Sequence, residues 1–179
     1  MNQDFRELLE AFNNEKVRYL IIGGYAVIKH TEPRYTKDLD VWVSPDKQNA
    51  ERVYAALQKF GAPLTGLSPN DFSEKGFFYT MGIAPQRVDV LFDIKGLEFE
   101  PCWGNRVGTD IGGLIVNFIS AEDLIINKEA VGRYQDLADA EKLRISQQRI
   151  RQRGQLAIET ATGEPDQKQE RDEGINFER

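Results

Sequence analysis

The stretch that decides the fold is Tyr19–Val43, which reads YLIIGGYAVIKHTEPRYTKDLDVWV. It opens with an apolar run that ends at the glycine pair Gly23-Gly24. After a spacer, Asp38 and Asp40 stand one residue apart, directly before a second apolar run. Short apolar runs bounded by glycine or polar residues are typical of buried strands. The stretch therefore predicts two strands that are connected through a glycine turn and a short helix.

Asp38 and Asp40 are the first candidate site residues. Side chains on a strand alternate between its faces, so both carboxylates would emerge on one face, about 7 Å apart, while Leu39 faces the core. Two like charges on one face cost stability unless a cation lies between them. Magnesium takes oxygen ligands, usually one or two carboxylates together with phosphates of a substrate. We therefore expect a magnesium site at these two residues.

The glycine pair supplies a second half of such a site. Gly23 and Gly24 have no side chains, so backbone N–H groups can approach a phosphate there. A helix that begins near Tyr25 would direct its positive end at the same point. Phosphate on the glycine turn and metal on the carboxylates would then share one pocket.

Together these residues resemble the DNA polymerase beta-like nucleotidyltransferase superfamily. The match consists of Gly23-Gly24, of Asp38-Leu39-Asp40 and of a third acid, Asp89, in the later segment RVDVLFDI. The resemblance implies an enzyme that moves a nucleoside monophosphate from a nucleoside triphosphate such as ATP to an acceptor hydroxyl. In that chemistry Asp38, Asp40 and Asp89 would hold two Mg²⁺ ions, with Mn²⁺ as the alternative metal, and Asp89 would also act as the base.

Within the superfamily the chain is most similar to the minimal and abortive-infection nucleotidyltransferases. Residues 34–40, RYTKDLD, follow the pattern R-x-T-x-D-[ILV]-D of that group, and residues 128–139, KEAVGRYQDLAD, follow K-x-x-A-x-x-R-x-K-D-x-x-D except at Gln135. Arg34, Lys37 and Lys128 are then expected to bind triphosphate oxygens. The alternative is that Arg34 and Lys37 are solvated loop charges and that Lys128 is a surface lysine with a buried stem.

The whole chain predicts an α/β (α+β) protein with the nucleotidyltransferase fold, in which helices pack on a mixed central sheet and further helices follow. The expected elements are a helix over 4–14, a strand over 17–22, a helix over 25–30, a strand over 38–43, a helix from Ser44 and Pro45 to Gly61, a loop over 62–75, strands over 76–82 and 86–94, an irregular segment over 96–113 with one or two short strands, a strand over 114–119 and a helix capped by Ser120. Phe99 and Trp103 are expected to cover the pocket floor.

The third carboxylate has two candidates. The strands 76–82 and 86–94 are connected so briefly that they must be antiparallel. If the second of them lies beside the Asp38 strand, Asp89 completes the acidic cluster. Asp93 shares the face of Asp89 and competes with it. We favour Asp89 because apolar residues bracket it in the same way as they bracket Asp40.

Length and composition fit one globular protein. The 179 residues suffice for a sizeable core. We divide the chain into a catalytic core over 1–119, a helical segment over 120–154 packed on that core, and a disordered acidic tail over 155–179. One cysteine allows no intrachain disulfide and favours a reducing compartment. Without a signal peptide or an apolar run of about 20 residues, we expect a cytoplasmic protein with no membrane contact.

The acceptor stays open at this stage. The resemblance implies either a toxin that adds nucleotides to the 3′ end of tRNA or an antitoxin that places AMP on a tyrosine of a cognate protein, both in toxin–antitoxin systems. The basic series Lys142, Arg144, Arg149, Arg151 and Arg153 favours RNA, whereas the net charge of −6 favours a protein acceptor. Also open are a small-molecule acceptor of the aminoglycoside type, a non-catalytic nucleotide- or partner-binding module of the same fold, and an adaptor that works through its acidic tail.

Overall fold

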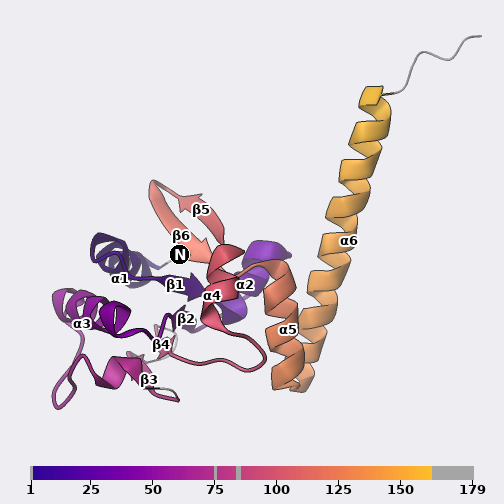
Figure 1. The fold of residues 1–179 in the computed structure, drawn as a ribbon. Helices are drawn as coiled ribbons and strands as arrows, with labels where there is room; N and C mark the ends of the chain where they lie inside the picture. The colour runs from indigo at the N-terminus through magenta and orange to yellow at the C-terminus, as the bar shows by residue number, and fades with distance from the viewer. Residues whose placement is uncertain (1, 75, 84–85, 163–179) are drawn as a thin grey trace, which may run out of the picture. The chain divides into compact units, whose positions relative to one another are not determined.

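The computed structural model describes residues 2–74, 76–83 and 86–162, and of residues 158–162 the backbone only (Figure 1). The chain divides into two compact units, residues 1–147 and residues 148–179. All the site residues expected from the sequence belong to the first unit. Among the helices described, none is long and apolar enough to cross a membrane.

The order of helices and strands follows the expected one closely. In chain order the described elements are α1 (Gln3–Asn14), β1 (Tyr19–Ile21), α2 (Gly23–His30), β2 (Leu39–Val43), α3 (Lys47–Phe60), the 3₁₀ turn η1 (Asp71–Ser73), β3 (Phe78–Met81), β4 (Val88–Leu91), α4 (Phe99–Gly104), β5 (Val107–Ile111), β6 (Leu114–Phe118), α5 (Ala121–Val131) and α6 (Tyr134–Thr162). The expected mixed α/β fold is confirmed.

The strands form one mixed sheet in the order β3-β4-β2-β1-β6-β5. Strand β2 is antiparallel to β1 and parallel to β4, and β3 is antiparallel to β4 as expected. Along β2, Leu39 and Val41 are fully buried in the core, so Asp40 between them points to the other face of the sheet. The parallel register places Asp40 directly opposite Asp89.

Helices cover the sheet through apolar residues at helical spacing. In α1, Phe5, Leu8, Leu9 and Phe12 are buried, and the helix packs against α3. The helix α2, which begins at the glycine pair, packs against both β2 and α5. Figure 1 shows α2 and α5 on the same side of the strands that carry the acidic residues. This packing fixes the glycine turn beside the strand that carries Asp40.

Three details differ from the expectation. The N-cap of α3 is Asp46 rather than Ser44, because the Asp46 carboxylate accepts the Asn49 N–H at 2.9 Å while the Ser44 hydroxyl donates to Asp46. The segment 96–113 contains the helix α4 in addition to β5. Helix α6 continues to Thr162, so residues 155–162 are helical, and the rest of the expected tail lies outside the described residues.

Candidate active site

The centre of the site is the carboxylate pair Asp40 and Asp89. Their strands are hydrogen-bonded neighbours and the two residues are in register, so their side chains stand side by side on one face of the sheet. Burial, and next the charge of Asp89, raise the pKa of Asp40 from 3.8 to about 6. Asp38 raises this pKa further, whereas Lys128 and Arg87 lower it. Burial and the neighbouring carboxylate therefore both disfavour the charged form of Asp40.

Asp38 lies immediately before β2 and joins the same cluster through Arg87. The Arg87 guanidinium is 2.8 Å from Asp38 Oδ2 and 3.0 Å from Asp89 Oδ2, so it bridges the two carboxylates. Arg87 reaches this point because its carbonyl accepts the Leu39 N–H, which aligns it with the start of β2. We did not predict Arg87 from the sequence. The strand pairing supplies the signal for it, since any residue before Val88 must lie beside Asp38.

The carboxylates fit a hard divalent cation in their donor chemistry. They present carboxylate oxygens alone, and Asp38 Oδ1 is buried without a hydrogen-bond partner in the described part of the chain. In the arrangement observed, no three His, Cys, Asp or Glu side chains within residues 2–74, 76–83 and 86–162 stand together as a metal-binding group, so Asp38, Asp40 and Asp89 would have to shift to hold a metal together. Arg87 lies between two of the three acids, so a cation there would replace its guanidinium.

The glycine pair is required by the close approach of side chains. Gly23 has φ of +60°, and a Cβ atom at this position would come within 2.0 Å of Asp40 Oδ2. A Cβ atom at Gly24 would come within 2.3 Å of Thr36 Oγ1. Any side chain at Gly23 would thus displace the Asp40 carboxylate. The pair lets α2 begin in contact with the acidic cluster.

A network of basic and acidic side chains connects the loop before β2 to helices α5 and α6. Arg34 forms a bidentate salt bridge with Asp139, in which its two terminal nitrogens lie 2.9 and 3.0 Å from the two carboxylate oxygens. Lys128 lies 2.8 Å from Asp136 and 3.5 Å from Asp139. Both aspartates are buried, and buried carboxylates need such partners. Arg34 is therefore not a solvated loop charge, and Lys128 is not an unpaired surface lysine.

Arg133, from the turn between α5 and α6, completes this network. Its Nε lies 2.6 Å from Asp136, while its side chain is largely exposed. Burial alone would raise the pKa of Asp136, but hydrogen bonds from Arg133 and Lys128 bring it below the usual range. The sequence pattern over residues 128–139 contains Lys128, Arg133 and Asp136, but it does not show that the two basic side chains both pair with Asp136.

These groups surround a cavity of about 670 Å³, within the size range of small-molecule sites. Of the expected site residues, Gly23, Gly24, Arg34, Asp38, Asp40 and Lys128 line it. Asp89 lies beside Asp40 without lining the cavity, and its carboxylate accepts a hydrogen bond from Thr80 at 2.8 Å. Lys37 is exposed and does not line the cavity. Asp93 lines the cavity from beyond the end of β4, out of register with Asp40.

One family model and several solved structures match this chain. The family model described as "Nucleotidyltransferase of unknown function (DUF6036)" matches residues 1–152. No curated protein matches the chain. Among solved structures, the protein TM1012 from Thermotoga maritima has a similar fold, with a TM-score of 0.50 and 17% identity over 83% of this chain and 91% of that one. The antibiotic-resistance factor ANT(2″)-Ia has a TM-score of 0.48 and 17% identity over 88% of this chain and 94% of that one.

Proposed function

We propose that this chain, which belongs to the DUF6036 family of nucleotidyltransferases, transfers a nucleoside monophosphate from a nucleoside triphosphate to an acceptor hydroxyl with the help of Mg²⁺. The family confirms the nucleotidyltransferase superfamily that the sequence resembles. The observation that carries the proposal is the Asp40–Asp89 pair. Two carboxylates in register on parallel strands, with one pKa raised to about 6, repel each other. Such an arrangement is stabilised when a divalent cation binds.

Asp38, Asp40 and Asp89 are the residues that would hold the metal, whether Mg²⁺ or Mn²⁺. When bound, two such ions would neutralise the leaving pyrophosphate and lower the pKa of the acceptor hydroxyl. The fit rests on the oxygen-only donor set and on the unpaired Asp38 Oδ1. With a metal on the carboxylates, Arg87 would be released from Asp38 and Asp89 and could bind an anionic substrate.

The other wall of the cavity suits the triphosphate. Gly23 and Gly24 begin α2, so the N-terminal end of this helix and its backbone N–H groups face the acidic cluster. Arg34 and Lys128 are held at the cavity by Asp136 and Asp139, which fixes their positions before a nucleotide binds. Binding and orienting the triphosphate against the carboxylates is the contribution we assign to these residues.

The carboxylate pair would receive the proton of the acceptor hydroxyl. A base works best when its pKa is near the working pH, and the pKa of Asp40 is closer to neutrality than that of an ordinary aspartate. Asp89 was the base that the resemblance implied. Asp40 and Asp89 lie side by side in register, so we assign proton acceptance to the pair rather than to one member.

A binding experiment tests the proposal without knowledge of the acceptor. A non-hydrolysable analogue of each of the four nucleoside triphosphates is titrated into the protein with Mg²⁺ and with EDTA. We expect Mg²⁺ to tighten binding of the nucleotide at least about tenfold. We expect Asp40→Asn to remove this effect of Mg²⁺. Asp71→Asn, at an exposed carboxylate outside the cavity, is the matched control. Binding that is equally tight in EDTA would instead support a non-catalytic nucleotide-binding module.

A further inference from the structure

Both oxygens of the Asp89 carboxylate are engaged by other groups of the chain. Its Oδ1 accepts a hydrogen bond from the Thr80 hydroxyl at 2.8 Å, and its Oδ2 lies 3.0 Å from Nη2 of Arg87. The same Arg87 nitrogen lies 2.8 Å from Asp38 Oδ2. A divalent cation would bind through these carboxylate oxygens. In the structure, therefore, the chain's own donors occupy Asp89 and one oxygen of Asp38.

The Asp89 side chain is held away from the catalytic cavity. Asp38 and Asp40 line this cavity of about 670 Å³, whereas Asp89 does not. The backbone of Asp89 is nevertheless in register with that of Asp40 on the adjacent strand. The separation of Asp89 from the cavity thus lies in the direction of its side chain and not in the strand pairing.

The order of the strands explains this direction. Strand β4 carries Asp89 and lies between β3, which carries Thr80, and β2, which carries Asp40. Thr80 is the direct cross-strand partner of Asp89 in the antiparallel pair of β3 with β4. Side chains in such a pair are close enough to interact. The hydrogen bond from Thr80 therefore draws the Asp89 carboxylate toward β3 and away from Asp40.

This arrangement leaves two buried polar atoms unsatisfied. Asp38 Oδ1 and Arg87 Nε have no hydrogen-bond partner in the described part of the chain. Buried polar groups without partners cost free energy. Arg87 is partly exposed and lines the catalytic cavity, so its guanidinium can move within that space. Arginine binds phosphate oxygens strongly, often with two parallel hydrogen bonds. A triphosphate in the cavity would thus compete with Asp38 and Asp89 for Arg87.

We propose that Thr80 and Arg87 form a latch, which holds Asp89 away from Asp40 in the free protein and which a bound triphosphate opens by taking Arg87. Asp89 then turns toward Asp40, and Asp38, Asp40 and Asp89 become available to a metal together. Metal binding is coupled to nucleotide binding in this way, and the coupling is reciprocal. This inference rests on the nucleotidyltransferase function proposed above and deepens it by naming how the site is regulated.

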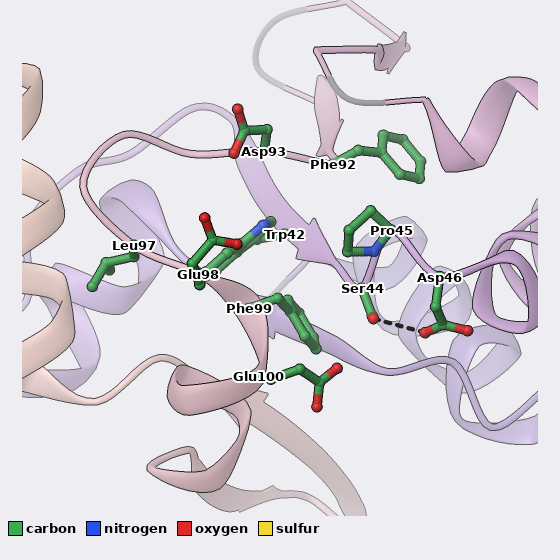
Figure 2. Close-up of a pocket in the computed structure, with 10 residues that line it drawn as sticks. All are labelled: Trp42, Ser44, Pro45, Asp46, Phe92, Asp93, Leu97, Glu98, Phe99 and Glu100. Carbon is green, nitrogen blue, oxygen red and sulfur yellow. Dashed lines mark hydrogen bonds between the residues drawn. The ribbon is translucent and has the colours of Figure 1, made fainter.

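Asp93, the competing third carboxylate, lies outside the latch. It is four residues beyond Asp89 and follows the end of β4 at Leu91. Figure 2 shows Asp93 and Phe92 on opposite sides of the segment that follows β4. Asp93 makes no ion pair with any residue in the described part of the chain. A metal site built on Asp93 would therefore bind its ion without any change at Thr80 or Arg87.

Titration of the full chain with Mn²⁺, followed by electron paramagnetic resonance, tests the latch without turnover. Thr80→Val removes the hydroxyl and keeps the β-branched shape that suits a strand. Without nucleotide, this variant should bind Mn²⁺ about threefold tighter than the wild type, and Thr80→Val combined with Arg87→Gln about tenfold tighter. In the presence of a saturating non-hydrolysable triphosphate analogue, Thr80→Val should match the wild type within about twofold, because the latch is then already open.

Three further variants serve as controls. Thr109→Val is the matched one, since Thr109 lies on the other edge strand, β5, and its hydroxyl has no hydrogen-bond partner in the described part of the chain. It should bind Mn²⁺ as the wild type does, with and without nucleotide. Asp89→Asn should remove the advantage of Thr80→Val in a double-mutant cycle, whereas Asp93→Asn should preserve it.

The results that overturn the latch differ from those that overturn the function. Nucleotide-free Mn²⁺ binding that Thr80→Val leaves unchanged would reject the latch, and weaker binding would show that Thr80 orients Asp89 for the metal instead. An advantage of Thr80→Val that persists in Asp89→Asn and disappears in Asp93→Asn would reject Asp89 as the third carboxylate. In each of these cases nucleotide binding that Mg²⁺ strengthens would retain the proposed function. Wild-type nucleotide binding that Mg²⁺ does not strengthen would reject the function and the latch together.

Discussion

Replacing Asp40 with Asn should stabilise the metal-free protein. Burial and the charge of Asp89 raise the pKa of Asp40 from 3.8 to about 6 in the folded chain. Between these two values the folded state binds more protons than the unfolded state, so the free energy of unfolding falls as the pH rises. The full penalty is present above about pH 7 and is lost below about pH 3. It amounts to about 3 kcal/mol, because one pKa unit corresponds to about 1.4 kcal/mol.

Asn has nearly the shape of a protonated Asp and carries no charge. In EDTA, Asp40→Asn should therefore be about 2 to 3 kcal/mol more stable than the wild type at pH 8 and within about 0.5 kcal/mol of it at pH 4. Urea unfolding at both pH values, followed by circular dichroism, measures the difference. Saturating Mg²⁺ should reduce the advantage of the variant, because the metal compensates the wild-type charge.

Asp71→Asn provides a control with the opposite sign. Hydrogen bonds from Ser68 lower the pKa of Asp71, so this carboxylate stabilises the fold in its charged form at pH 8, and the variant should lose stability there. A gain for Asp40→Asn that is the same at pH 4 and pH 8 would refute the electrostatic reasoning, as would no gain at pH 8.

Three further predictions follow from the geometry. Gly23→Ala should lower the free energy of unfolding by about 2 kcal/mol or more and abolish nucleotide binding, because its Cβ would meet Asp40 Oδ2 at 2.0 Å. The control Gly61→Ala, at φ of +86° with no atom within 4 Å, should lower it by only about 1 kcal/mol. Equal losses for the two variants in thermal denaturation would contradict this. Asp139→Asn should lower the free energy of unfolding by about 3 kcal/mol, because it breaks the buried ion pair with Arg34 and removes the charge that faces Lys128. The control Glu141→Gln, at an exposed position, should change it by less than about 0.5 kcal/mol. Urea unfolding of both variants measures the difference. Arg87→Gln should tighten binding of Mn²⁺ in the absence of nucleotide about three- to tenfold, because the metal no longer has to displace a guanidinium from Asp38 and Asp89. Titration followed by electron paramagnetic resonance measures this affinity. Unchanged or weaker binding would show that Arg87 does not compete with the metal.

Most of the fold could be predicted because local signals agree with the tertiary structure. Short apolar runs between glycine and polar residues became strands, and the apolar stripe of α1 became a buried helix face. Gly61 ends α3 in a left-handed conformation, and Ser120 caps α5, as expected. The start of α3 was misjudged because Ser44 and Asp46 both suit an N-cap, and the choice depends on how the chain leaves β2.

The composition of the candidate site was less predictable, since it depends on pairing between distant segments. Strand alternation was enough to place Asp38 and Asp40 near each other, but Arg87 enters only through the parallel pairing of β2 with β4. The pattern over residues 128–139 was visible, yet its ion pairs with Arg34 require the approach of α6 to the loop before β2. Phe99 and Trp103 were expected to cover the floor of the catalytic pocket, but neither lines that cavity. Phe99 instead packs edge to face with Trp42 and stacks on Trp103.

The basic series in α6 was also interpreted too simply from the sequence. Arg144 pairs with Glu129 of α5 and with Glu141 one turn earlier in α6. A run of like charges in the sequence can thus be compensated by acids from other segments. The argument for an RNA acceptor loses part of its basis.

The most direct test of the central claim is transfer of label from a nucleoside triphosphate. The protein is incubated with each of the four triphosphates labelled at the α-phosphate, with Mg²⁺ and with total RNA, cell protein or an aminoglycoside as acceptor. We predict that label moves to an acceptor with release of pyrophosphate, and that Asp40→Asn and Asp89→Asn each lose at least about 10³-fold in rate while remaining folded. Transfer that persists in either variant would contradict the assignment of the carboxylate pair as the catalytic centre.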